Sequence, residues 1–160
     1  MNQALQVGAL WLHSLATVIL IGYYLLLALV FIPAFGKDPK GSSIGPMIEQ
    51  VTPRTRILMV ASLFGLIVTG VYLMFFDPSY AGFADFGNTW GIVMLIKHIL
   101  VVIMIGLGYF TDRTILPAVS KPVKGKPGVN PFIKQLKAIV NLLAILGVAI
   151  LLLTAVAQIL

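Results

Sequence analysis

The chain has 160 residues, of which 59% are hydrophobic and only 10% are charged. Soluble domains carry about 25% charged residues, so this sequence has too little polar surface for water and we expect lipid as its solvent. Cysteine is absent, which excludes disulfides, thiolate nucleophiles and cysteine metal sites. The net charge is +6, but the basic residues lack interleaved aromatic residues, so no nucleic-acid partner is expected.

Four apolar runs are long enough to cross a bilayer, which takes about 20 residues each. In chain order they cover residues 7–33, 57–76, 90–111 and 138–160. We therefore predict an all-α fold, a four-transmembrane-helix bundle that forms a single integral membrane domain over residues 1–160.

The basic residues indicate how these spans are oriented. All of them except Lys97 lie in the loops 34–56 and 112–137, whereas the loop 77–89 contains none. Cytoplasmic loops carry the excess of Lys and Arg. We expect the two basic loops in the cytoplasm, and both termini and the loop 77–89 on the outer, periplasmic side of a bacterial cytoplasmic membrane.

The chain has two histidines, and both lie inside apolar runs. His13 lies about 9 Å and His98 about 12 Å from the outer end of its span, at about 1.5 Å per helical residue. Ionisable side chains in hydrocarbon are costly and mark functional sites. We therefore take both histidines as candidate functional residues at similar depth.

A weak internal repeat supports a common role for the two histidines. A shift of 85 residues aligns three pairs, which are His13 with His98, Tyr24 with Tyr109, and Thr69 with Thr154. The pattern predicts a two-helix unit duplicated in parallel about an axis along the membrane normal. Such an axis would let both imidazoles approach one point, with a tyrosine three turns further along each face.

The ligand chemistry favours haem b in this position. The spans contain no Asp or Glu, so hard cations and zinc lack enough ligands. A b-type haem needs one axial ligand on each face and an apolar slot between helices, which His13 and His98 would supply. Lys97 would pair with a haem propionate or extend to the interface. Copper is the alternative, with Met94 as a soft ligand, and two structural histidines bonded to carbonyls are a third possibility.

Two segments resemble a known family. "WLHSLATVILIGYYLLLALVFIPAF" resembles the first helix of the copper-resistance protein D (CopD) family, with its W-[LI]-H-x-L-A opening, mid-helix glycine and terminal proline. "WGIVMLIKHILVVIMIGLGYFTDR" resembles a later helix of that family, with Lys97 on its lysine. The related HemJ-type protoporphyrinogen oxidases share the histidine and lysine helices, which implies b-type haem on His13. Two residues depart from these patterns. His98 stands where both families usually have an apolar residue, and Asn141 stands where the copper family tends to have a glutamate.

We expect a membrane b-type haem-binding protein or subunit for electron transfer, since bis-histidine ligation leaves no open position for oxygen chemistry. A stand-alone enzyme is less expected. One haem cannot span about 30 Å of hydrocarbon, so the expected partners are membrane lipid and other redox subunits or a quinone. The alternatives are a HemJ-like porphyrinogen oxidase, an accessory structural subunit of a membrane complex, and a CopD-like copper transport or binding protein. The last would use His13, Met74, Met94 and His98.

Overall fold

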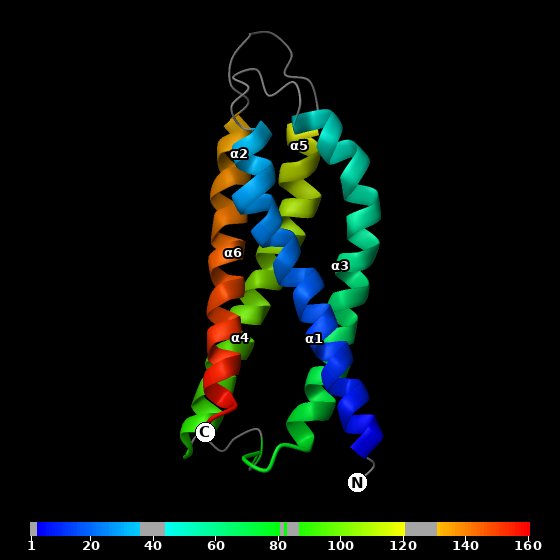
Figure 1. Cartoon of the computed structure of the whole chain (residues 1–160). Helices are drawn as coiled ribbons and strands as arrows, with labels where there is room; N and C mark the ends of the chain where they lie inside the picture. Colours follow the sequence, from blue (N-terminus) through cyan, green and yellow to red (C-terminus); the bar gives the residue numbers. More distant parts are fainter. Residues whose placement is uncertain (1–2, 36–43, 81, 83–86, 121–130) are drawn as a thin grey trace.

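The described part of the protein is a bundle of long helices. The computed structural model describes residues 3–35, 44–80, 82, 87–120 and 131–160. Over these residues every regular element is helical (Figure 1). Four helical stretches are long and apolar enough to cross a membrane, namely Gln3–Ala34, Gln50–Phe75, Thr89–Val119 and Phe132–Ala157. The prediction of an all-α bundle with four spans is confirmed.

Two of the four spans contain a short π-helical segment. The elements are α1 (Gln3–Leu26), the π-helix η1 (Leu27–Phe31), α2 (Ile32–Phe35), α3 (Ile44–Phe75), α4 (Thr89–Phe110), the π-helix η2 (Thr111–Ile115), α5 (Leu116–Ser120) and α6 (Pro131–Ala157). The third helical stretch therefore continues past residue 111, where we expected it to end. Backbone hydrogen bonds can continue a helix beyond its apolar part. The start of α6 is a second example, because this helix already includes the exposed Lys134.

The helices pack in chain order around the bundle. α1 packs against α3 and α6, α4 packs against α6, and α5 packs against α3. The first and third spans are therefore diagonal to each other. Both termini, the end of α3 and the start of α4 lie at one end of the bundle, which we call the terminal end (Figure 1). The opposite end, where α2 and α5 finish, we call the loop end. The assignment of the terminal end to the outer side of the membrane stays a prediction.

The two π-helices strengthen the case for a duplicated unit. η1 and η2 are followed by the similar segments "IPAF" and "LPAV", with Pro33 and Pro117 at matching places. These features align at a shift of 84 residues, one fewer than the shift that aligns the histidines. In the register set by the π-helices, His13 corresponds to Lys97 rather than to His98. π-helical turns inside α-helices often mark functional sites.

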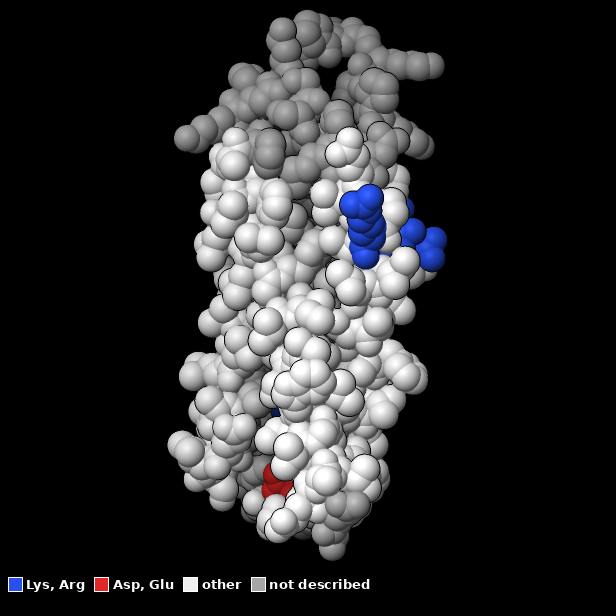
Figure 2. All heavy atoms as spheres, turned by 45° about the vertical axis from the view of Figure 1, so that its right-hand side comes forward, with Lys and Arg blue, Asp and Glu red and all other residues white. Residues whose placement is uncertain are grey.

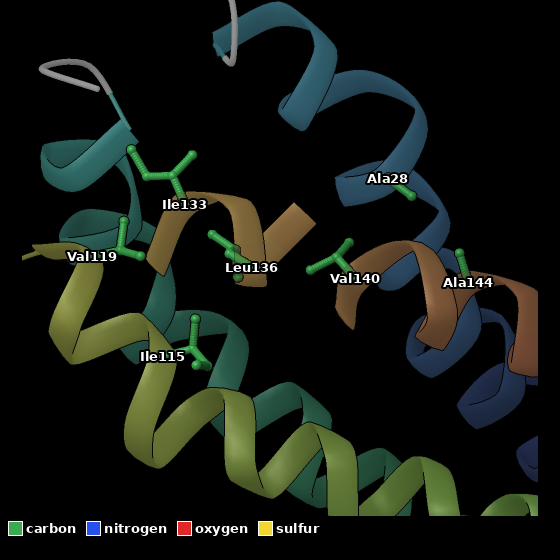
Figure 3. Packing of buried hydrophobic residues seen from close by; sticks show 7 residues of the cluster. All are labelled: Ala28, Ile115, Val119, Ile133, Leu136, Val140 and Ala144. Atoms are coloured by element: carbon green, nitrogen blue, oxygen red, sulfur yellow. The ribbon is translucent and has the colours of Figure 1, made fainter. Parts of the chain in front are cut away.

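The apolar side chains fall into a lipid-facing surface and two small cores. Large exposed side chains cover the outside of every span, for example Val18, Phe64, Val102 and Leu152. The core toward the loop end, the first cluster, contains Ala28, Ile115, Val119, Ile133, Leu136, Val140 and Ala144 (Figure 3). The second cluster, nearer the middle, contains Ile21, Tyr24, Met104, Leu143 and Ile150. The exposed apolar surface fits a bundle whose solvent is lipid.

Charged side chains are unevenly distributed along the bundle. On the face turned forward in Figure 2, basic side chains gather toward the loop end and a small acidic area lies near the terminal end, and the surface between them is uncharged apart from a small basic spot. The exposed arginines of α3 and η2 belong to the loop end, and they are Arg54, Arg56 and Arg113. An uncharged belt between two charged ends is what a membrane-spanning protein needs.

Candidate functional site

His13 lies on the side of α1 that packs against α3. It is half-buried, and its Nδ1 is 2.9 Å from the hydroxyl oxygen of Thr69. The Thr69 hydroxyl donates its own proton to the backbone carbonyl of Gly65, with an O···O distance of 2.6 Å. His13 and Thr69 therefore form a polar contact between the first two spans, inside the terminal half of the bundle.

The proton count fixes the tautomer of His13. A threonine hydroxyl has one proton, and here that proton is already given to Gly65. Thr69 can then only accept from His13, so the proton of the neutral imidazole lies on Nδ1. The lone pair is left on Nε2. An imidazole held in this way, with one nitrogen donating and the other free to bind, is the usual arrangement of a metal-ligating histidine.

Two glycines of α3 make room for this contact. A Cβ atom at Gly70 would lie 3.3 Å from Cε1 of His13, and one at Gly65 would lie 3.8 Å from the Cβ of Ala16. The first distance is too short for an ordinary contact, so a side chain at position 70 would push the imidazole away. The sequence "GLIVTG" therefore supplies both the hydroxyl partner and the space that His13 needs.

Lys97, rather than His98, is on the inner face of the third span. One stripe of α4, with a residue every three or four positions, is buried or half-buried throughout, and it consists of Trp90, Met94, Lys97, Val101, Met104 and Gly108. Lys97 is half-buried on this stripe and acts electrostatically on His13. His13 and Lys97, which correspond in the π-helix register, are therefore both half-buried on the inner sides of their spans.

The structure does not bring His13 and His98 together. His98 follows Lys97 and so points about 100° away around the helix. It is exposed on the lipid-facing side, where its Nδ1–H donates to the carbonyl of Met94 on its own helix at 2.6 Å. A haem with one imidazole on each face does not fit this arrangement. The 85-residue register of the sequence repeat was the source of the error, because one residue changes the face of a helix.

The two tyrosines that we expected at the site also differ in burial. Tyr24 is buried, and a Cβ at Gly108 would lie 2.7 Å from its hydroxyl oxygen, so glycine lets α1 and α4 meet there. Tyr109 is 65% exposed, and the Arg113 guanidinium lies 5.7 Å from its ring centroid. Of the expected residues, Tyr24 therefore lies inside the bundle and Met94 is half-buried, whereas His98 and Tyr109 lie on the outside of α4.

Two methionines lie next to the His13 region. Met74 is one turn from Gly70 on α3, and Met94 is one turn from Lys97 on α4, both toward the terminal end. Both are half-buried. In the described ranges no three His, Cys, Asp or Glu side chains group closely enough to hold a metal ion. Any metal in this half of the bundle would depend on imidazole and thioether ligands.

Sequence reasoning missed Thr69 as a partner of His13 and missed a second polar group at the loop end. There Arg56 pairs with Asp112, with Nη2 2.9 Å from Oδ1. Thr69 could have been found from the two glycines near it, Gly65 and Gly70, which mark a close helix approach. Asp112 was overlooked because we expected the third span to end at residue 111, and no simple pattern predicts the π-helix that continues it.

The fold and this site define an integral membrane four-helix protein with an inward-facing histidine and no carboxylate beside it. The family model of copper resistance protein D matches residues 49–157, more than half of the chain. The chain therefore belongs to the copper resistance protein D family. The matched region begins in α3, so α1 and His13 precede it. No curated protein and no solved structure matches the chain. The relation to HemJ-type proteins stays a prediction.

Proposed function

We propose that this protein carries copper through the membrane and that His13 is its central copper ligand. The family to which the chain belongs supports a role in copper handling. The observation that carries the residue assignment is the bond from Nδ1–H of His13 to Thr69, which leaves the Nε2 lone pair for a metal inside the bundle. Copper is then the cargo that passes through the site and not a resident cofactor.

The ligand chemistry suits monovalent copper. Imidazole and thioether groups are the ligands that Cu(I) accepts, whereas Mg²⁺ and Ca²⁺ need several oxygens. Met74 and Met94 lie one turn nearer the terminal end than the residues that face His13. A copper ion that enters at that end would meet thioether groups first and the imidazole next. A small set of neutral ligands holds an ion less tightly than a closed thiolate site, which favours release.

The positive charge of Lys97 favours passage of copper through the site over stable copper binding. Its ammonium acts electrostatically on His13 from the facing helix. A cation bound at Nε2 would be repelled by this charge, and the repulsion is stronger in a membrane interior than in water. We infer that Lys97 limits how long copper resides on His13. The HemJ-like oxidase remains an untested alternative that would use the same two residues.

Bis-histidine haem ligation has no support in this geometry, because His98 is exposed on the outside of the bundle. The electron-transfer role, and the redox subunits or quinone that it required, depended on that ligation. The copper alternative needs only His13 and its neighbours. We retain the proposal that the terminal end faces the outside, because the excess of Lys and Arg lies toward the loop end.

The test is copper uptake by reconstituted protein. Liposomes containing the purified chain and an internal Cu(I) indicator would receive Cu(I) kept reduced outside. We expect His13→Ala to lower the initial rate to that of protein-free liposomes. The matched control is His98→Ala, which removes the exposed imidazole and should leave the rate unchanged. Equal rates for His13→Ala and the wild type would overturn the assignment, and a wild-type rate equal to that of empty liposomes would overturn the function.

A further inference from the structure

An ion pair joins the two repeats at the loop end of the bundle. Nε and Nη2 of Arg56 on α3 both donate to Oδ1 of Asp112 on η2, at 3.1 and 2.9 Å. The side chains are 49% and 27% exposed, respectively. On α3, Arg56 is thirteen residues from Thr69, the partner of His13, so the two polar levels are about 20 Å apart at about 1.5 Å per residue. The ion pair is therefore separate from the His13 site.

The repeat shows what replaces this ion pair on the other side of the bundle. In the 84-residue register, Arg56 corresponds to Val140 and Asp112 corresponds to Ala28. Val140 and Ala28 belong to the first cluster, where both are buried, and η1 packs directly on α6 (Figure 3). The two positions that are apolar and buried on this side thus carry a partly exposed ion pair on the other side, where α5 also packs against α3.

A cavity lies about one helical turn from the ion pair, because Thr52 and Leu116 in its lining are each four residues from a member of the pair. It has a volume of about 40 Å³ and is lined from all four spans, for example by Tyr23, Thr52, Leu116 and Val140. A void of this size can hold a water molecule, which needs a cavity of about 10–15 Å³. Two polar residues, Tyr23 and Thr52, line the cavity, and Thr52 is one turn from Arg56 on α3. A polar side chain therefore lies next to both the ion pair and the cavity.

The two sides differ in the strength of their closure. A partly exposed ion pair contributes little and weakens further in salt. Opening the apolar side would expose Val140, which is 1% exposed, and the other buried members of the first cluster. Asp112 is also carried by a π-helix, a form of helix that is tolerated only as a short insertion. The contact between Arg56 and Asp112 is therefore weaker than its apolar counterpart, and the packing of α5 on α3 lies beside it.

We propose that Arg56 and Asp112 form a gate between α3 and η2 that closes the loop end of the copper route over this cavity. The assignment of copper as the cargo rests on the function proposed above, but the gate itself can be tested without copper. When the pair separates, α3 moves away from η2 and the cavity opens to the solvent at the loop end. The apolar contact between η1 and α6 keeps the repeats together meanwhile.

The absence of cysteine allows a direct accessibility test. Val140→Cys places a reporter thiol in the cavity wall, and Leu143→Cys places a matched thiol one turn further along α6, where Leu143 is 0% exposed and does not line the cavity. Each reporter would be combined with Asp112→Asn, which keeps the side-chain size but removes the charge. The labelling rate by a small cationic methanethiosulfonate would be measured in permeabilised proteoliposomes.

The gate predicts that Asp112→Asn raises the labelling rate of the residue-140 reporter about three- to fivefold, in keeping with the contribution of a partly exposed ion pair. The rate of the residue-143 reporter should not change. The exchange Arg56→Asp with Asp112→Arg re-forms the pair and should restore the slow rate. An unchanged rate at position 140, or an equal rise at both positions, would overturn the gate. Failure of the wild type to carry copper would overturn the proposed function but not the labelling result.

Discussion

Replacing Thr69 by valine tests whether the His13 imidazole is held for metal binding. Thr69→Val keeps the shape of the side chain but removes the oxygen that accepts from Nδ1–H of His13 at 2.9 Å. It also removes the hydroxyl bond to Gly65. The imidazole would then lose both its fixed orientation and its fixed tautomer. We expect copper to bind more weakly as a result.

The magnitude follows from the role of Thr69 as a partner of the ligand rather than a ligand itself. Loss of such a partner typically lowers metal affinity about 10- to 100-fold. This corresponds to about 1.4–2.8 kcal/mol, at about 1.4 kcal/mol per factor of ten. The bundle itself should lose less stability than the roughly 1–3 kcal/mol cost of a fully buried unpaired donor, because His13 is only half-buried.

The assay is a competition titration of Cu(I) between a coloured chelator and the detergent-purified protein. Thr154→Val is the matched control, because Thr154 is also a threonine late in a span and its hydroxyl likewise donates to the carbonyl four residues earlier, at 2.8 Å. The described hydrogen bonds give Thr154 no histidine partner. Equal affinities for Thr69→Val and the wild type, or an equal loss in Thr154→Val, would refute the reasoning.

Three further predictions follow from the packing and the charge distribution. Gly70→Ala should weaken Cu(I) binding in the same titration, because its Cβ would lie 3.3 Å from Cε1 of His13, whereas Gly106→Ala, with nothing within 4 Å, should bind as the wild type does. Gly147→Ala should lower the melting temperature, since its Cβ would lie 2.8 Å from Cγ2 of buried Ile21 and such overpacking costs about 1–3 kcal/mol. Again Gly106→Ala is the control, and equal melting temperatures would contradict the packing. Alkaline phosphatase fused to either terminus should be active if the terminal end is periplasmic, and inactive fusions would reverse the orientation.

The bundle could be predicted from the sequence because lipid imposes a strong length requirement. Each span needs about 20 apolar residues, and the sequence meets that requirement in four places. The side of α1 that faces the bundle was expected to carry His13 and Tyr24, and in the structure His13 is half-buried and Tyr24 is buried. The shared position of the termini followed from the number of spans.

The inner face of α4 could not be predicted. In a soluble helix polar residues mark the outer face, but in lipid both faces are apolar and the contrast disappears. His98 was placed inside because ionisable groups in membranes are usually functional, a rule that does not distinguish Lys97 from its neighbour. The repeat added to the error, because the histidines align at 85 residues whereas the π-helices align at 84.

The central claim is that His13 binds copper, and X-ray absorption at the copper edge tests it most directly. Purified protein loaded with one equivalent of Cu(I) would be compared with His13→Ala and His98→Ala. The account predicts scattering from imidazole, with sulfur from Met74 or Met94, and loss of the imidazole signal only in His13→Ala. An imidazole signal that persists in His13→Ala, or that disappears in His98→Ala, would contradict the claim.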